Sequence, residues 1–145
     1  NVPRPSGFDN RTMLKGAYVI AEATGAPTLA IVATGSEVEV ALGVKKILDA
    51  EGERVRVVSA PCWDLFERQD AAYRQRVLPR GVPRPAVAAG VTAGWRKYVG
   101  AEDDPRAAAV GIDRFGESAP GGVLFKYFDF TAEHVAAAVR GTLAP

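Results

Sequence analysis

Two short turns hold the residues best suited to bind a small anion, in the segments Thr34–Val38 and Arg114–Ser118. Each segment follows an apolar run and precedes a predicted helix, so free backbone N–H groups would lie outside the carboxyl end of a parallel strand. The guanidinium group of Arg114 would add positive charge. Together these features define a candidate regulatory module for a small anion. Its candidate residues are Thr34, Gly35, Ser36, Arg114, Gly116 and Ser118.

A plainer interpretation is that Ser36 and Ser118 only cap their helices. Neither turn has the glycine spacing of a P-loop or a dinucleotide-binding fingerprint. Glu37 and Glu117 would also repel an anion that approached from their side. Ser36 and Glu39 have the S-x-x-E spacing of a capping box, in which each side chain bonds the other residue's backbone N–H. We therefore favour capping over anion binding at both turns.

A serine nucleophile is the other chemistry to consider. The run Gly116–Pro120 resembles the G-x-S-x-G elbow of α/β-hydrolases, and Asp129 and His134 follow in the right order. The last position of the elbow needs glycine for close helix–strand approach, whereas this chain has proline there. No oxyanion segment precedes the run, and His134 falls in the first turn of a predicted helix. We therefore set the hydrolase interpretation aside.

Metal and cofactor chemistry also lack a candidate site. His134 is the only histidine and Cys62 the only cysteine, so a soft-ligand zinc cluster cannot be assembled. Cys62, between a proline and a tryptophan, is predicted to be a small, half-buried apolar residue. The residues thus predict no catalytic, cofactor-binding or metal-binding position in this segment.

An aromatic set is predicted to pack in the core, with a subunit contact as the alternative. Its members are Phe125, Tyr127, Phe128 and Phe130.

Composition places these turns in one ordinary globular domain. The chain has 145 residues, and 18 basic against 17 acidic residues give a net charge of +1. This balance offers no electrostatic argument for nucleic acid or an anionic membrane as partner. No run is long enough to span a bilayer and no signal-peptide pattern opens the chain. A single cysteine fits a reducing compartment, and we expect the cytoplasm. The first residue is Asn1 rather than methionine, which suggests a piece of something longer.

The stretch Thr28–Gly52 organises the predicted fold. Thr28–Thr34 is short and apolar, as expected of a strand covered on both faces. Gly35 allows a sharp turn, an amphipathic helix follows, and Gly52 supplies its left-handed stop. A strand that leads directly into a helix is the first half of a βαβ unit, so the pattern predicts an α/β fold.

Shorter patterns complete the sheet. Only four residues separate the strand Ala17–Ala23 from Thr28–Thr34, too few for a crossover helix, so the two are predicted to be antiparallel. The strand Val55–Ser59 should be parallel to Thr28–Thr34. Further strands are expected at Pro85–Ala89 and Ala108–Ile112.

Helical segments are expected at Asp70–Leu78, Trp95–Tyr98, Pro120–Phe128 and Ala132–Leu143, the last capped by Thr131. Irregular segments are expected at Asn1–Lys15, Pro61–Leu65 and Glu102–Arg106. The product is a five-stranded mixed sheet with helices on both faces.

Several motifs together resemble the C-terminal domain of transketolase. They are Lys15–Ile20, Ala33–Ala41, Arg56–Pro79, Trp95–Gly100 and Gly111–Pro120. The resemblance implies a three-layer αβα sandwich with a mixed five-stranded sheet whose first strand is antiparallel to the rest. It also implies that residues 1–15 are a linker after a missing pyrimidine-binding domain, and that residues 16–145 are the C-terminal domain. Ala89 departs from the family, because many relatives carry glutamate there, and any role of that acid is in doubt here.

The resemblance also implies an activity for the parent enzyme. Family members transfer a two-carbon ketol unit between ketose and aldose phosphates in the pentose phosphate pathway, with thiamine diphosphate and a divalent cation, Mg or Ca. Their cofactor, metal and catalytic residues lie in the two preceding domains, across a homodimer interface. None can be carried onto a position of this chain. The segment alone is therefore expected to be an inactive, dimer-supporting domain.

Overall fold

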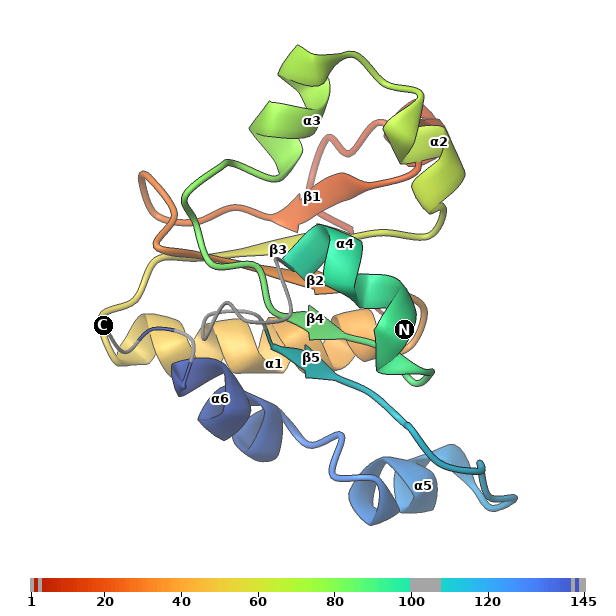
Figure 1. The fold of residues 1–145 in the computed structure, drawn as a ribbon. Helices are drawn as coiled ribbons and strands as arrows, with labels where there is room; N and C mark the ends of the chain where they lie inside the picture. Colours follow the sequence, from red (N-terminus) through yellow and green to blue (C-terminus); the bar gives the residue numbers. More distant parts are fainter. Residues whose placement is uncertain (1, 3, 100–107, 142, 144–145) are drawn as a thin grey trace.

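A mixed five-stranded sheet lies between two sets of helices (Figure 1). The structure is a computed structural model that describes residues 2, 4–99, 108–141 and 143. The strands are β1 (Tyr18–Ala21), β2 (Leu29–Ala33), β3 (Val55–Ser59), β4 (Ala86–Val87) and β5 (Ala109–Val110). The α-helices are α1 (Glu37–Ala50), α2 (Trp63–Glu67), α3 (Ala71–Val77), α4 (Arg96–Val99), α5 (Gly121–Tyr127) and α6 (Ala132–Arg140). Two 3₁₀ helices are η1 (Asn10–Lys15) and η2 (Thr92–Trp95).

The central strand is β2, and all five of its residues are buried. It is parallel to β3 on one side, with Leu29 opposite Val55, and parallel to β4 on the other, with Val32 opposite Ala86. The sheet order is β1-β3-β2-β4-β5. The predicted strand Thr28–Thr34 and its parallel partner Val55–Ser59 are therefore confirmed.

The first strand is antiparallel to the rest, as predicted. Its hydrogen-bonded neighbour is β3, where Tyr18 pairs with Ser59, rather than the next strand along the chain. The crossover through α1 places β3 between β1 and β2, so the short β1–β2 connection spans one intervening strand. The predicted fold class, a mixed sheet with an antiparallel first strand, is confirmed.

Helices cover both faces of the sheet, which makes the fold a three-layer αβα sandwich. Side chains of α1 and α6, such as Val44 and Val135, share one buried cluster with Ile31 of β2. The helices α2, α3 and α4 contribute to a second cluster, which contains Val32 and Val58 from the sheet. Neighbouring residues of β2 thus enter opposite cores, as the period of two along a strand requires.

The end of α1 confirms the stop predicted at Gly52. Its φ is 96°, and its N–H donates to Asp49 O at 3.1 Å. The N–H of Glu53 donates to Leu48 O at 3.0 Å. This pair of bonds is a Schellman motif, which satisfies carbonyl groups that the helix leaves free.

Several segments differ from their predicted structure or bounds. Of the predicted strand Ala108–Ile112, only Ala109–Val110 forms β5. The segment Pro61–Leu65, expected to be irregular, contains the start of α2, where Trp63 stacks on Tyr98 with ring centroids 3.4 Å apart. The strand β4 is shorter than Pro85–Ala89 at both ends, and at its first position proline has no N–H to donate. The linker Asn1–Lys15 ends in η1, and Asp9, the N-cap before it, accepts a hydrogen bond from the backbone N–H of Arg11 at 2.9 Å. The predicted loop Glu102–Arg106 lies outside the described residues.

Gly16 fixes the distance between η1 and α2. Its φ is +85°, and a Cβ atom at this position would lie 2.2 Å from Cys62 O and 2.4 Å from Phe66 N. Its carbonyl accepts a hydrogen bond from Cys62 N at 3.0 Å. Both the backbone conformation and the close approach of the chain therefore require glycine.

We expect Gly16→Ala to lower the free energy of unfolding by about 3 kcal/mol or more, because positive φ and a clash with backbone atoms add together. Gly25→Ala is the matched control, since Gly25 has φ +90° but open space where a Cβ atom would lie. It should cost only about 1–2 kcal/mol. Urea unfolding followed by circular dichroism measures both. If both variants lost the same free energy of unfolding, the close approach of the backbone at Gly16 would contribute nothing to the cost of the substitution.

Candidate functional site

The two predicted turns meet at the carboxyl edge of the sheet. A cavity of about 270 Å³ is lined by Ser36 from the first turn and Gly116 from the second. Ala89, which follows β4, lines the same cavity. The strands β2, β4 and β5 are mutually parallel neighbours, so their carboxyl ends lie at one edge and bring these positions together. Thr34, Gly35, Arg114 and Ser118 do not line this cavity.

The wall of this cavity is mostly apolar and carries two carboxylates. The carboxylate of Glu37 is buried, with 4% of the residue exposed, and Glu117 also lines the space. The remaining lining side chains come largely from the region of α5. They are Ile112, Leu124, Phe125, Phe128 and Phe130. Negative charge in an apolar surround opposes an anion rather than attracting one.

The capping prediction is wrong at Ser36. This residue precedes α1, but its backbone is already helical, with φ −67° and ψ −24°, and its side chain makes no capping bond. Its Oγ donates instead to Glu37 Oε1 at 2.6 Å. A capping side chain needs an extended backbone at this position, so the capping box with Glu39 does not form.

The capping prediction is also wrong at Ser118. The residue that flanks the start of α5 is Pro120, with φ −54° and ψ 137° and no side-chain capping bond. Its carbonyl accepts the first backbone bonds of the helix, from Val123 N at 2.8 Å and Leu124 N at 3.1 Å. The fixed φ of proline suits a helix start, and it leaves Ser118 outside the helix.

Arg114 faces aromatic rings. Its guanidinium carbon lies 4.8 Å from the ring centroids of both Tyr127 and Phe128. Its Nη1 also donates to Tyr127 Oη at 3.2 Å. These contacts link the second turn to the end of α5 through cation–π attraction. Anion binding by the six candidate residues stays a prediction.

The hydrolase constellation does not assemble in the described part of the chain. No hydrogen bond there joins any two of Ser118, Asp129 and His134. The backbone N–H of His134 donates to Thr131 Oγ1 at 3.2 Å, which confirms the predicted cap of α6. Among the described residues, no three histidine, cysteine, aspartate or glutamate side chains gather in a group that could hold a metal ion. These residues therefore do not fit a divalent-cation site of their own.

The predicted aromatic set divides between core and surface. Phe130 is buried, and Phe125 and Phe128 pack against the cluster shared by α1 and α6. Tyr127 is 51% exposed. Phe115, in the second turn, is 96% exposed. Packing is therefore confirmed for three of the four rings, and a subunit contact by the exposed ones stays a prediction.

Sequence reasoning missed a cluster between α2 and α4. The carboxylate oxygen Oε1 of Glu67 accepts hydrogen bonds from Lys97 Nζ at 2.6 Å and from the hydroxyl of Tyr98. The hydrogen bond from Lys97 is the main cause that lowers the pKa of Glu67. Burial first, and the hydrogen bond to Glu67 second, raise the pKa of Tyr98. Thirty residues separate Glu67 from Lys97, and no local pattern links them.

The described residues thus form a three-layer αβα domain in which no catalytic constellation assembles. A family model described as the transketolase-like TK C-terminal domain matches residues 16–131. The chain therefore belongs to the transketolase family, within its C-terminal domain.

Individual relatives agree with this assignment. A transketolase of Nostoc sp. is 45% identical over 144 residues, and one of Aquifex aeolicus is 51% identical over 123 residues. The solved transketolase of Leishmania mexicana superposes with a TM-score of 0.84 at 44% identity, over 97% of this chain. A structure described as a split-gene transketolase in an inactive β4 tetramer has a TM-score of 0.63 at 23% identity, which shows the fold alone.

The chain spans about a fifth of the length of the curated relatives named above. It covers 21% of the Nostoc protein, 17% of the Aquifex protein and 20% of the Leishmania chain. These relatives give no support to the alternative regulatory module for a small anion. No helix in the described ranges is both long and apolar enough to cross a membrane.

We expect phosphate, added at constant ionic strength, to leave the backbone amide signals of Gly35 and Gly116 unchanged in two-dimensional NMR spectra. The reason is the carboxylate pair, Glu37 and Glu117, on the wall between the two turns. A saturable shift of both signals that Arg114→Gln weakens would instead establish the anion site.

We expect Tyr98 to ionise only above the ordinary tyrosine value of about 10, because its pKa is raised. The stabilisation linked to this shift is fully present below the unfolded-state pKa and is lost as pH rises through the folded-state pKa. Tyrosinate absorbance, titrated in the wild type and in Tyr98→Phe, gives the titration of Tyr98 by difference.

Glu67→Gln should move that difference titration to lower pH, because it removes the negative charge beside the hydroxyl. The matched control is Glu133→Gln, which changes an exposed carboxylate on α6 and should leave the titration of Tyr98 in place. If Tyr98 titrated at the same pH in Glu67→Gln and in Glu133→Gln, the carboxylate of Glu67 would not be a cause of the raised pKa of Tyr98.

Proposed function

We propose that this chain is the C-terminal domain of an enzyme that transfers a two-carbon ketol unit from a ketose phosphate to an aldose phosphate. The supporting observation is 45% identity to a transketolase over 99% of the chain. The domain itself is non-catalytic in this proposal. Residues 1–15 form the linker from a preceding domain, and residues 16–145 form the domain.

The chemistry then belongs to partner domains of the same polypeptide. We propose that the preceding domains hold thiamine diphosphate and a divalent cation, Mg or Ca, and that the parent enzyme is a cytoplasmic homodimer of the pentose phosphate pathway. The cofactor supplies the carbanion chemistry of ketol transfer.

The role of this domain is structural in the proposal. Both faces of its sheet are already covered by its own helices, so its cores need no partner. Three of the large apolar side chains that are exposed in the described part of the chain, Phe115, Val123 and Tyr127, lie in or near α5, whereas Leu14, Leu65 and Val91 are exposed on other segments. Exposed apolar surface of this kind suits a contact with another domain or subunit.

We expect the isolated chain to show no turnover of xylulose 5-phosphate and ribose 5-phosphate in the presence of thiamine diphosphate and magnesium. Fusion of the chain behind the preceding domains of the Aquifex aeolicus transketolase should give an active enzyme. Omission of thiamine diphosphate from the fusion is the control. Turnover by the isolated chain would end the proposal of a non-catalytic domain.

Variants of the fusion separate a structural from a chemical role. Ser118→Ala and His134→Ala should each leave kcat/KM within about twofold, since both side chains are exposed and outside either core. Removal of residues 16–145 should abolish or strongly reduce activity together with dimer formation, which analytical ultracentrifugation measures. A dimeric, fully active truncation would contradict the supporting role.

A further inference from the structure

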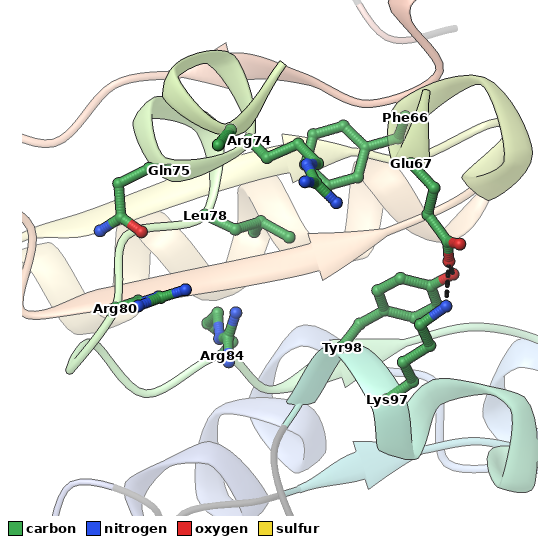
Figure 2. A pocket seen from close by; sticks show the side chains of 10 residues that line it. Phe66, Glu67, Arg74, Gln75, Leu78, Arg80, Arg84, Lys97 and Tyr98 are labelled. Atoms are coloured by element: carbon green, nitrogen blue, oxygen red, sulfur yellow. Dashed lines mark hydrogen bonds and ion pairs between the residues drawn. The ribbon is translucent and has the colours of Figure 1, made fainter. Parts of the chain in front are cut away.

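A second cavity, on the opposite face of the sheet from α1 and α6, has several cationic side chains in its wall. It has a volume of about 290 Å³ and lies between α2, α3, α4 and the segment that joins α3 to β4 (Figure 2). Four cations and one carboxylate, Glu67, line it. The cations are Arg74, Arg80, Arg84 and Lys97. Figure 2 shows that they come from three separate segments of the chain and surround one hollow.

The single carboxylate is already engaged. Glu67 Oε1 accepts hydrogen bonds from Lys97 and Tyr98, and the charge of Arg74 also helps to lower the pKa of this carboxyl. Among the described residues that line the cavity, no second carboxylate is left for Arg80 and Arg84. Neither Arg80 nor Arg84 makes a hydrogen bond or ion pair with any residue in the described ranges. Like charges around one hollow repel each other, so this arrangement is stabilised when an anion enters.

Arg84 gives the strongest indication of a ligand. It is half-buried, and burial alone lowers the pKa of its guanidinium group. A guanidinium that is partly shielded from water, without a carboxylate partner, has lost part of its hydration, and no hydrogen bond from a described residue replaces it. An anion in the cavity would supply that partner through paired N–H···O bonds.

The form of the cavity limits the ligand. Its volume is at the small end of ligand sites, where a short phosphate ester or free phosphate fits. Planar guanidinium groups match the oxygen geometry of phosphate, and several of them balance a dianion better than a monoanion. The side-chain amide of Gln75 lies on the wall as a further donor, and the ring of Tyr98 forms an apolar side.

We propose that this cavity binds a small phosphate-bearing anion through the three guanidinium groups and the ammonium group that line it. The inference goes beyond the proposed ketol transfer and does not depend on it. Binding is measured without turnover, so a failed anion site and a failed activity assignment are distinguishable.

The test is a titration of the 145-residue chain with inorganic phosphate and with glycerol 3-phosphate, at constant ionic strength. Glycerol and chloride are the controls for the ester's carbon part and for charge alone. We expect saturable shifts of the arginine Nε–H signals and of the Gln75 side-chain amide in NMR spectra, with affinity from calorimetry. Tighter binding of the ester than of phosphate would identify an ester ligand, and equal binding would identify the phosphate group alone.

Variants assign the site. Arg84→Gln should weaken binding by about tenfold or more, because it removes a charged donor of two hydrogen bonds. If Arg84→Gln lowers the melting temperature, its effect on binding could come from a loss of stability. Arg74→Gln and Arg80→Gln then test the site instead, because both residues are exposed. Arg68→Gln makes the same charge change outside the cavity and should leave affinity within about twofold.

Three results would overturn the proposal. They are equal affinities in Arg84→Gln and Arg68→Gln, shifts that chloride reproduces, and stronger binding of the dicarboxylate malonate than of phosphate.

Discussion

Burial of β2 on both faces is the constraint on which the structure depends. A strand without a solvent face must pair its backbone groups on both sides. The N–H groups of Ala30 and Val32 donate to Pro83 O at 3.0 Å and Pro85 O at 2.9 Å. The carbonyl of Ala33 accepts from Ala60 N at 2.9 Å. These bonds place the β3 and β4 segments beside β2, and the helices that connect them must then cover the two faces (Figure 1).

This layered arrangement separates apolar from charged surfaces. The carboxyl edge of the sheet, where ligands of parallel α/β folds usually bind, holds a buried Glu37 in a mostly apolar hollow. Positive charge gathers instead over the second face, around Arg80 and Arg84. The two regions lie on different elements and can act independently. The proposed contact with a catalytic partner and the proposed anion site thus lie on different surfaces of the domain.

Elements with strong local patterns were predicted well, whereas the side-chain bonds at the two candidate turns were predicted poorly. The helix α1, its stop at Gly52 and the cap at Thr131 follow from spacing, glycine geometry and capping chemistry. The serines at the two turns looked equally clear, yet neither caps a helix. At Ser36 a neighbouring carboxylate accepts the hydroxyl instead, and near Ser118 a proline determines the helix start. Competition between local partners decides such bonds, and a spacing rule does not describe that competition.

The sequence by itself determined the fold class, the direction of β1, the buried central strand and the resemblance to the family. These depend on runs of neighbouring residues, whose hydrophobic period and turn chemistry are local properties. The tertiary structure alone decided that α2 forms around Trp63, that Glu67 meets Lys97 and Tyr98, and that arginines from two segments share a cavity. Those contacts join residues far apart in the chain. Such contacts can stabilise the protein only after the sheet has brought the helices together.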